Sequence, residues 1–462
     1  MQYVSTRGAA PILDFAGVVL SGLADDGGLY VPQVWPGLSV AELRSLQGRS
    51  YAEVAQRVVQ LFVGQSLDRA TLSALIEDAY TGFDHAAVAP LRQIDPDTWL
   101  LELFHGPTLA FKDCALQLLG RLMDHFLARE KRRLTVVAAT SGDTGSAAIE
   151  ACRDRAAIDI FVFHPKGRIS EVQRRQMTTV MSENVHNIAI EGTFDDCQAL
   201  VKRLFADDEF RTEVSLGAVN SINWARIVAQ IVYYVAAGLA LGAPVRRAAF
   251  SVPTGNFGDV YAGYCAARIG LPVSQLIVAT NSNDILARFF DHGEYTPAQV
   301  MATMSPSMDI QVASNFERLL FDMYDGDSKA VTTCMGALDQ AGTFSVERER
   351  VANRAGLFTA HCVDEEGTLK AIRDIEESAG IVVDPHTAVG ISAGRAVRQP
   401  GDVPLVCLAT AHPAKFPDAV ERALGTLPPD EPKIAELFER EERYAVLAND
   451  PVIVKGYLRD CL

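Results

Sequence analysis

Beyond Leu91, short apolar runs rich in β-branched residues alternate with longer helical segments, and this alternation constrains the fold of the chain most strongly. Strands that alternate with helices form parallel sheets through right-handed crossovers, with helices on both faces. We therefore expect an α/β fold with two domains, each built on a twisted, mostly parallel sheet flanked by helices. The expected strands are 134–139, 158–163, 185–190, 248–252, 274–280 and 403–409, and the expected helices are 146–153, 194–205 and 259–269.

The first ninety residues differ from the rest, because helical patterns at 51–63 and 67–80 are separated by polar turns. A length of 462 residues suits two domains with an added smaller region. We expect a mainly helical N-terminal region at 1–90, an α/β domain at 91–220 and a larger α/β domain at 221–462. These boundaries are approximate, and the domains need not be continuous in sequence.

The net charge of −16 argues against nucleic acid or an anionic membrane as a partner. An anionic substrate must then be captured by a local basic site. The apolar stretch 227–245 superficially resembles a membrane span, but its glycines, alanines and tyrosines favour a buried helix. The N-terminus lacks the apolar core of a signal peptide, and the eight scattered cysteines suggest buried free thiols in a reducing compartment. We expect a cytoplasmic protein without a bound metal.

Lys112 is one of only nine lysines and lies in an apolar segment of small residues, 103–113. An ammonium with apolar neighbours loses hydration, which lowers its pKa and yields a neutral amine. A neutral amine is what a lysine needs to form a Schiff base with an aldehyde cofactor. The alternative is a lysine that simply extends its charge to the surface.

The segment 253–259, Pro-Thr-Gly-Asn-Phe-Gly-Asp, connects an expected strand to an expected helix. Its glycines let the backbone approach a ligand, and free N–H groups at a helix start bind anions. It is neither a P-loop nor a dinucleotide fingerprint, because the required lysine and glycine spacing are missing. The turn suits a small phosphate monoester, or it is an ordinary strand-to-helix connection.

A second such turn, 140–145, could bind a carboxylate through Ser141, Thr144 and its backbone amides, or serve only as a helix N-cap. Thr410, at another strand end, offers a neutral hydroxyl, and His412 near it suits a loop histidine. A reactive lysine, two anion-binding turns and this hydroxyl together suit an amino acid bound to pyridoxal phosphate, which acts as an electron sink.

Nine segments in order along the chain resemble those of threonine synthases, pyridoxal-phosphate enzymes of the tryptophan synthase β-chain fold type (fold type II). They run nearly from end to end, so together they are far more specific than any one of them. They are STRG (5–8), GLA (22–24) with DGGLYVP (26–32), FHGPTLAFKD (104–113), TSGDTG (140–145), SINWAR (221–226), GNFGD (255–259), SNFERLL (314–320), DPHTA (384–388) and TAHPAKF (410–416).

The resemblance implies that Lys112 is the Schiff-base lysine and that Thr410 faces the pyridine nitrogen of the cofactor. It places Asp143 beside the phenolic oxygen, where many relatives of this fold type carry asparagine. Two neighbouring anions would repel, so we expect a raised pKa for Asp143 or an intervening donor. The residues that the resemblance assigns to the cofactor phosphate are Gly255, Asn256, Phe257, Gly258 and Asp259.

The implied reaction converts O-phospho-L-homoserine and water into L-threonine and phosphate, the last step of threonine biosynthesis. Lys112 would remove the α-proton, and Lys112 or the substrate phosphate would move the β-proton. The candidates for the substrate phosphate are Lys166 and Arg168, which we favour, and then Arg226. The residues expected around the rest of the substrate are Thr140, Ser141, Gly142 and Thr144.

Three other functions remain open at this stage. The same lysine and turns would serve a serine or threonine dehydratase, or a lyase acting on phosphorylated hydroxy amino acids. A catalytically silent protein that binds pyridoxal phosphate would share them too. The sequence leaves the choice between monomer and homodimer open.

Overall fold

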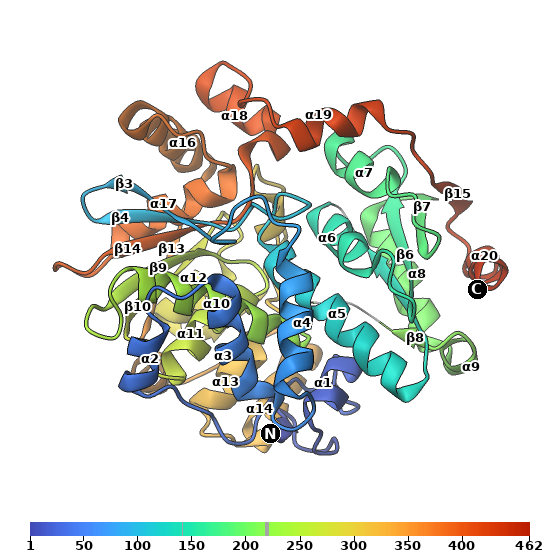
Figure 1. Ribbon diagram of the computed structural model, residues 1–462, viewed down its shortest axis with the longest axis horizontal. Coiled ribbons are helices and arrows are strands. Elements are labelled where there is room, and N and C mark those ends of the chain that lie inside the picture. Colours follow the sequence, from blue (N-terminus) through green and yellow to red (C-terminus); the bar gives the residue numbers. More distant parts are fainter. Residues whose placement is uncertain (141, 218–220) are drawn as a thin grey trace.

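Two mainly parallel sheets with helices on their faces form the framework of the protein (Figure 1). The structure is a computed structural model that describes residues 1–140, 142–217 and 221–462. In the six-stranded sheet, β3 pairs antiparallel with β4 and the other neighbours pair parallel. The expected α/β fold is therefore confirmed. In spatial order this sheet contains β13 (Phe358–Cys362), β10 (Val273–Thr280), β9 (Ala248–Pro253), β14 (Leu405–Ala409), β4 (Thr98–Glu102) and β3 (Leu91–Asp95).

The second sheet has five strands, all parallel, and its outermost strand comes from the C-terminal part of the chain (Figure 1). In spatial order it contains β15 (Ala445–Ala448), β7 (Val185–Glu191), β6 (Ile158–Pro165), β5 (Leu134–Ala139) and β8 (Leu216–Gly217). Two short antiparallel pairs lie outside both sheets: β1 (Tyr3–Ser5) with β2 (Tyr30–Pro32), and β11 (Glu294–Tyr295) with β12 (Phe344–Ser345).

The N-terminal region contributes four helices, of which α1, α3 and α4 pack against the two long central helices α5 (Lys112–Glu130) and α10 (Trp224–Ala240). The second helix pattern begins two residues later than expected, since Asp68 caps its first turn by accepting from the Thr71 amide. These four helices are α1 (Phe15–Ser21), α2 (Val40–Leu46), α3 (Tyr51–Val63) and α4 (Arg69–Tyr80).

The remaining helices cover the faces of the two sheets or continue the chain around them. On one face of the six-stranded sheet lies α17, and on the other lies α11. The helices outside the N-terminal and central groups are α6 (Asp143–Cys152), α7 (Glu171–Thr178), α8 (Phe194–Ala206), α9 (Asp208–Glu213), α11 (Gly258–Arg268), α12 (Ile285–His292), α13 (Phe316–Met323), α14 (Ser328–Ala341), α15 (Arg348–Arg354), α16 (Glu365–Ala379), α17 (Pro385–Val397), α18 (Pro417–Leu424), α19 (Pro432–Glu439) and α20 (Pro451–Cys461), with 3₁₀ turns η1 (Pro306–Met308) and η2 (Pro413–Lys415).

The apolar stretch that resembled a membrane span forms α10, which is buried on nearly every side among α3, α5 and α11. It ends at Ala240, because Gly242 adopts a positive φ and Pro244 cannot donate to a helical hydrogen bond. Among the described residues, no helix has both the length and the apolar character needed to cross a membrane. The expected buried helix is confirmed.

Most expected strands are found close to their predicted bounds. The strand expected at 403–409 starts at Leu405, since Pro404 has no N–H for the ladder. The sequence patterns missed β3, β4, β13 and β15. Because β3 and β4 pair within the sheet of residues 248–409, and β15 joins the other sheet, the chain crosses between the sheets more than once. The division at residues 90 and 220 stays a prediction about folding units.

All eight cysteines lie in the described part of the chain and are free thiols. Six are buried, as expected from their apolar surroundings, whereas Cys362 is exposed and Cys461 is half-buried. Cys362 ends the outermost strand β13 of its sheet, where fewer neighbours cover a side chain.

Candidate active site

Most of the sequence-predicted residues meet between the two sheets, whereas Lys166 and Arg168 are exposed. Three neighbouring strands of the six-stranded sheet, β9, β14 and β4, lead at their carboxyl ends into the 254–257 loop, Thr410 and the segment before Lys112. The turn after β5 brings in Asp143 from the other sheet. An ion pair across the gap, from Lys415 Nζ to Asp143 Oδ1 at 2.9 Å, joins the two sides. The carboxyl ends of parallel strands are where such sheets bind ligands.

Lys112 begins α5 and is only 7% exposed. Its amine lies 4.9 Å from the centre of the Phe111 ring, and no hydrogen bond or ion pair holds it within the part of the chain that the structure describes. Burial lowers the pKa of Lys112 to about 8, against the opposing charge of Asp143 and with the help of Arg226 and Lys415. The amine is thus dehydrated, unpaired and neutral in a large fraction of molecules near pH 8.

Backbone pairing fixes Lys112 beside Thr410. The Phe111 N–H donates to the Thr410 carbonyl at 2.8 Å, and the His412 N–H donates to the Leu109 carbonyl at 3.0 Å. The Thr410 N–H in turn donates to the Thr387 hydroxyl at 3.2 Å. Thr410 is 5% exposed, so its hydroxyl lies inside the site and not on the surface.

The loop before α11 approaches its surroundings closely. A Cβ at Gly255 would lie 2.7 Å from the Ser307 carbonyl oxygen, so a side chain does not fit there. Phe257 adopts φ +63°, and no side chain caps the helix that starts at Gly258. The first amides of a helix have no acceptor within the helix. This start is therefore suited to an anion such as a phosphate monoester.

The Asp259 side chain lies within the protein interior and binds α10. Its Oδ1 accepts from the Tyr233 hydroxyl at 2.5 Å and from the Tyr234 hydroxyl at 2.9 Å. Burial raises the pKa of Asp259 to about 6, against these two hydrogen bonds and the charge of Arg226. A carboxylate would repel a phosphate, so the part of Asp259 that suits the phosphate is its backbone N–H in the first turn of α11.

Around the second turn, the Thr140 hydroxyl holds the loop in shape. It accepts from the Gly142 and Gly145 N–H groups and donates to the Gly142 carbonyl, each at 3.0 Å. Ser141 lies outside the described residues. Thr144, in contrast, exposes its side chain in the first turn of α6, and no side chain of the described residues caps that helix. The start of α6 is thus available to a carboxylate, with Thr140 in a supporting role.

For Asp143 the expectation was a raised pKa or an intervening donor, and the structure shows neighbouring donors and a lowered pKa. Burial raises its pKa, but the positive charges of Lys415 and Lys112 outweigh this effect and hold the pKa of Asp143 below its usual value. Donors are indeed present: Lys415, and the Gln173 side-chain amide, whose Nε2 lies 3.2 Å from Oδ1. Asp143 is therefore an ionised carboxylate, and the donors next to it neutralise its charge.

The three candidate cations for the substrate phosphate differ in burial. Lys166 is exposed and pairs with Glu191 at 3.1 Å, and Arg168 is exposed in the following turn. Arg226 is 5% exposed, and its Nη1 has no hydrogen-bond partner among the described residues. Burial lowers the pKa of Arg226 to about 10, so it stays charged near neutral pH. A buried, unpaired guanidinium favours Arg226 over the two residues that the sequence favoured.

Lys415 is the residue that the sequence analysis most clearly missed. Its side chain is fully buried, and its amine donates to Asp143 and, at 2.6 Å, to the Thr108 carbonyl. Lys415 belongs to the family-like segment 410–416, but the resemblance was not used to assign a role to this lysine. The signal that could have found it is a second lysine among the nine that follows a strand end of this sheet.

Asp384, His386 and Thr387, at the start of α17, form a second group without a predicted role. The His386 Nδ1 lies 2.8 Å from Asp384 Oδ1, and its Nε2 accepts from the Ser307 N–H at 3.2 Å. Through Thr387 this group also fixes Thr410. The group therefore contacts two parts of the candidate site: Thr410, through Thr387, and Ser307, which packs against Gly255, through His386.

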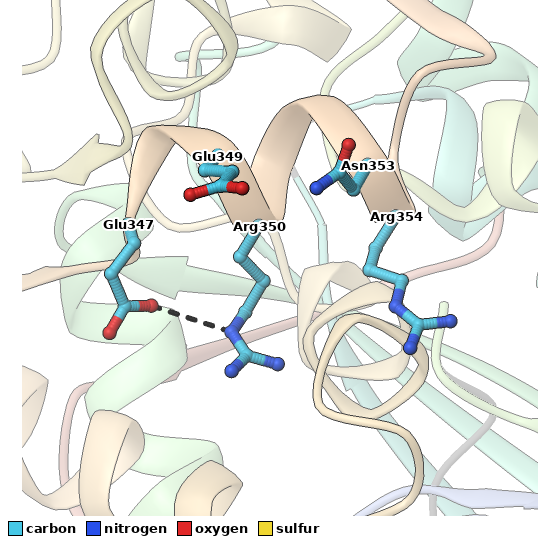
Figure 2. Close-up of a pocket in the computed structure, with 5 residues that line it drawn as sticks. All are labelled: Glu347, Glu349, Arg350, Asn353 and Arg354. Atoms are coloured by element: carbon cyan, nitrogen blue, oxygen red, sulfur yellow. Dashed lines mark hydrogen bonds and ion pairs between the residues drawn. The ribbon is translucent and has the colours of Figure 1, made fainter.

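A surface hollow of about 310 Å³ lies on α15, and none of the candidate-site residues lines it (Figure 2). Three of its four charged side chains are already paired: Glu347 with Arg350 at 3.4 Å, and Arg354 with Asp325 at 2.8 Å. A ligand there would have to displace existing ion pairs. We assign no function to it.

Comparisons with known proteins agree with this geometry. Three family models match: "Threonine synthase N terminus" at residues 2–80, "Pyridoxal-phosphate dependent enzyme" at 86–339, and "Threonine synthase, C-terminal" at 387–458. The threonine synthase of Pseudomonas aeruginosa is 55% identical over 99% of this chain and 98% of its own length. That of Schizosaccharomyces pombe is 42% identical over 92% of this chain and 90% of its own.

Solved structures agree as well. The crystal structure of threonine synthase with bound pyridoxal phosphate from Brucella melitensis superposes with a TM-score of 0.98 at 50% identity, covering 100% of this chain and 99% of its own. The yeast enzyme superposes with a TM-score of 0.95 at 39% identity, covering 100% and 98%. On these sequence and structural matches, the chain belongs to the threonine synthase family of pyridoxal-phosphate-dependent enzymes.

Proposed function

We propose that this chain converts O-phospho-L-homoserine and water into L-threonine and phosphate, with pyridoxal phosphate as cofactor. The observation that carries the proposal is the buried amine of Lys112 between two helix starts, α6 and α11; within residues 1–140, 142–217 and 221–462 the amine has no hydrogen-bond or ion-pair partner and neither helix start has a side-chain cap. One start, at α11, suits the cofactor phosphate, and the other, at α6, suits the substrate carboxylate. Membership of the threonine synthase family supports the same reaction.

The residues present fit pyridoxal phosphate. Lys112 would supply the amine that bonds to the aldehyde, and the amides of Gly258 and Asp259 at the start of α11 would hold the phosphate. Thr410 would offer its neutral hydroxyl to the pyridine nitrogen, and Asp143, paired with Lys415, would lie on the phenolic side. When bound, the cofactor supplies an electron sink for the negative charge that develops at the substrate α-carbon.

Lys112 is suited both to accept a proton from the substrate and to donate one to it. With a pKa of about 8, both its neutral and its protonated forms are populated near neutral pH. The neutral amine would accept the α-proton of the substrate, and the resulting ammonium would return a proton to the α-carbon after water has added at the β-carbon. Burial keeps bulk water from exchanging with this proton.

The product pattern tests the reaction. We expect the purified chain, incubated with O-phospho-L-homoserine, to release phosphate and L-threonine in equal amounts. A serine or threonine dehydratase, or a lyase that only eliminates phosphate, would form a 2-oxoacid in place of threonine. A silent cofactor-binding protein would show the visible absorbance of the lysine-bound cofactor without product. Phosphate assay with amino-acid chromatography separates these outcomes.

Arg226 is proposed to bind the substrate phosphate, because the net charge of −16 offers no general attraction for a dianion. Replacing Arg226 with Gln should lower kcat/KM for O-phospho-L-homoserine about 10- to 100-fold, as expected for a lost charge-assisted hydrogen bond. Steady-state kinetics measure this, with Lys166→Gln as the comparison, which should change kcat/KM less than about twofold. A loss of pyridoxal phosphate affinity in Arg226→Gln, with KM unchanged, would assign Arg226 to the cofactor phosphate.

A cytoplasmic location of the enzyme is proposed, because its substrate and cofactor are small, water-soluble molecules. The choice between monomer and homodimer stays a prediction, as does the absence of nucleic-acid partners.

A further inference from the structure

The peptide that joins Asn256 to Phe257, at the centre of the cofactor-phosphate loop, is held by one residue from outside the loop. Phe257 is a non-glycine residue at φ +63°, a conformation that persists only where neighbours fix it. The Asn256 carbonyl accepts two hydrogen bonds from Asn315, one from its backbone N–H at 3.0 Å and one from its side-chain Nδ2 at 3.1 Å. Asn315 is fully buried.

Arg318, one turn further along α13, sets the orientation of the Asn315 amide. Its Nη1 donates to Asn315 Oδ1, so the Nδ2 side of the amide must face the Asn256 and Ser221 carbonyls. The remaining donors of Arg318 are also used: Nη2 donates to the Ile222 carbonyl at 2.6 Å and Nε to the Tyr30 carbonyl at 3.1 Å. Arg318 has no exposed surface and lies over the Trp224 ring.

The Tyr30 carbonyl belongs to β2 of the N-terminal region. The β1–β2 pair is anchored to α13 next to Arg318, since the Thr6 hydroxyl donates to Glu317 Oε1 at 2.6 Å and Arg7 pairs with Glu317 at 3.0 Å. A continuous set of hydrogen bonds therefore runs from the N-terminal strands through Arg318 and Asn315 to the phosphate loop. None of these residues has a role in the reaction itself.

We propose that Asn315 and Arg318 are positioning residues for the cofactor-phosphate loop. Arg318 orients the Asn315 amide, and Asn315 holds the Asn256–Phe257 peptide so that the amides at the start of α11 face the phosphate. The N-terminal region contributes through the Tyr30 carbonyl. This inference rests on the proposed function, which assigns the loop to the phosphate of pyridoxal phosphate.

The variant Asn315→Asp tests the inference with little change in shape. An aspartate keeps an oxygen for Arg318, but it places a second oxygen, in place of the Nδ2 donor, against the Asn256 and Ser221 carbonyls. In full-length protein freed of cofactor, the Kd for pyridoxine 5′-phosphate should rise about 10- to 100-fold. The Kd for pyridoxine, which lacks the phosphate, should change less than about threefold. Isothermal titration calorimetry measures both constants without any catalytic assay.

A second variant and a matched control complete the test. Arg318→Lys keeps the charge but cannot reach all three carbonyl and amide acceptors. The preference for the phosphorylated form, which is the ratio of the Kd for pyridoxine to the Kd for pyridoxine 5′-phosphate, should therefore fall as in Asn315→Asp. This variant decides the matter if Asn315→Asp does not fold. Val351→Ala, on α15 against α13, removes buried packing only and should leave the preference unchanged.

An unchanged preference in both folded variants would overturn the inference, and so would an equal loss of affinity for pyridoxine and its phosphate. The same loss in Val351→Ala would also overturn it, because reduced stability alone would then explain the effect. If the unaltered protein itself shows no preference for pyridoxine 5′-phosphate, the assignment of the phosphate loop in the proposed function fails instead.

Discussion

Lys112→Ala should lower kcat for threonine formation by at least about 10³-fold and abolish the visible absorbance of the lysine-bound cofactor. The amine of Lys112 is buried and unpaired, and no other lysine amine in the described part of the chain combines these two features. A positioned acid–base group alone contributes about 10² to 10⁴ in rate, and the covalent bond to the cofactor adds to this. Single-turnover kinetics and absorbance spectra of the purified variant measure the effect.

Two further variants make this prediction specific. Lys112→Arg retains the positive charge but should be equally inactive, because a guanidinium does not lose its proton near neutral pH. Lys202→Ala, on the surface of α8, should retain the parental rate and spectrum. Parental activity in Lys112→Ala would exclude the proposed role of this lysine.

The pH dependence of cofactor capture reports the lowered pKa of Lys112. Only the neutral amine attacks an aldehyde, so the capture rate of the cofactor-free protein should rise with pH and level off above about 8. A surface lysine, with its usual pKa near 10.4, would show a rate that still rises beyond pH 9. Stopped-flow absorbance across this pH range distinguishes the two.

Lys415→Met should lower the free energy of unfolding by about 3 to 5 kcal/mol near neutral pH, as expected when a buried ion pair loses one partner. Asp143 would then be an ionised carboxylate in the protein interior, with the Gln173 amide as its only side-chain donor among the described residues. Urea unfolding of the cofactor-free protein, followed by circular dichroism, measures the loss.

The pair can be tested by a double-mutant cycle. Asp143→Asn combined with Lys415→Met removes both charges, so the double variant should be more stable than the sum of the single changes predicts. Because the folded-state pKa of Asp143 is depressed, the stability it contributes is present above its unfolded pKa and is lost as the pH falls through the lower folded value. The difference between Lys415→Met and the unaltered protein should therefore narrow as the solution is acidified. Simple additivity at pH 7 would contradict the proposed pairing.

Much of the fold follows from patterns that are local in sequence. The strand 134–139 and the helix 51–63 have the bounds that hydrophobic periodicity predicts. The patterns failed at β3, β4, β13 and β15, which are strands of four or five residues. β4, β13 and β15 pair with strands that lie far away in sequence, whereas β3 pairs with its chain neighbour β4. Their place in a sheet depends on the neighbour that completes the hydrogen bonds, and a single strand carries no signal of its neighbour.

For the site, the sequence by itself determined the α/β class, the apolar setting of Lys112 and the two strand-to-helix turns, because each depends on residues adjacent in the chain. The tertiary structure decided which charges are buried and which are paired. It placed Arg226 in the interior and Lys166 at the surface, and it brought Lys415 to Asp143 and Asn315 to Asn256. Burial and pairing arise only when distant segments pack together. Burial raises the pKa of Asp143, but the charges of Lys415 and Lys112 lower it overall, whereas the phenolic oxygen implied by the resemblance suggested a raised pKa or a donor between the two groups.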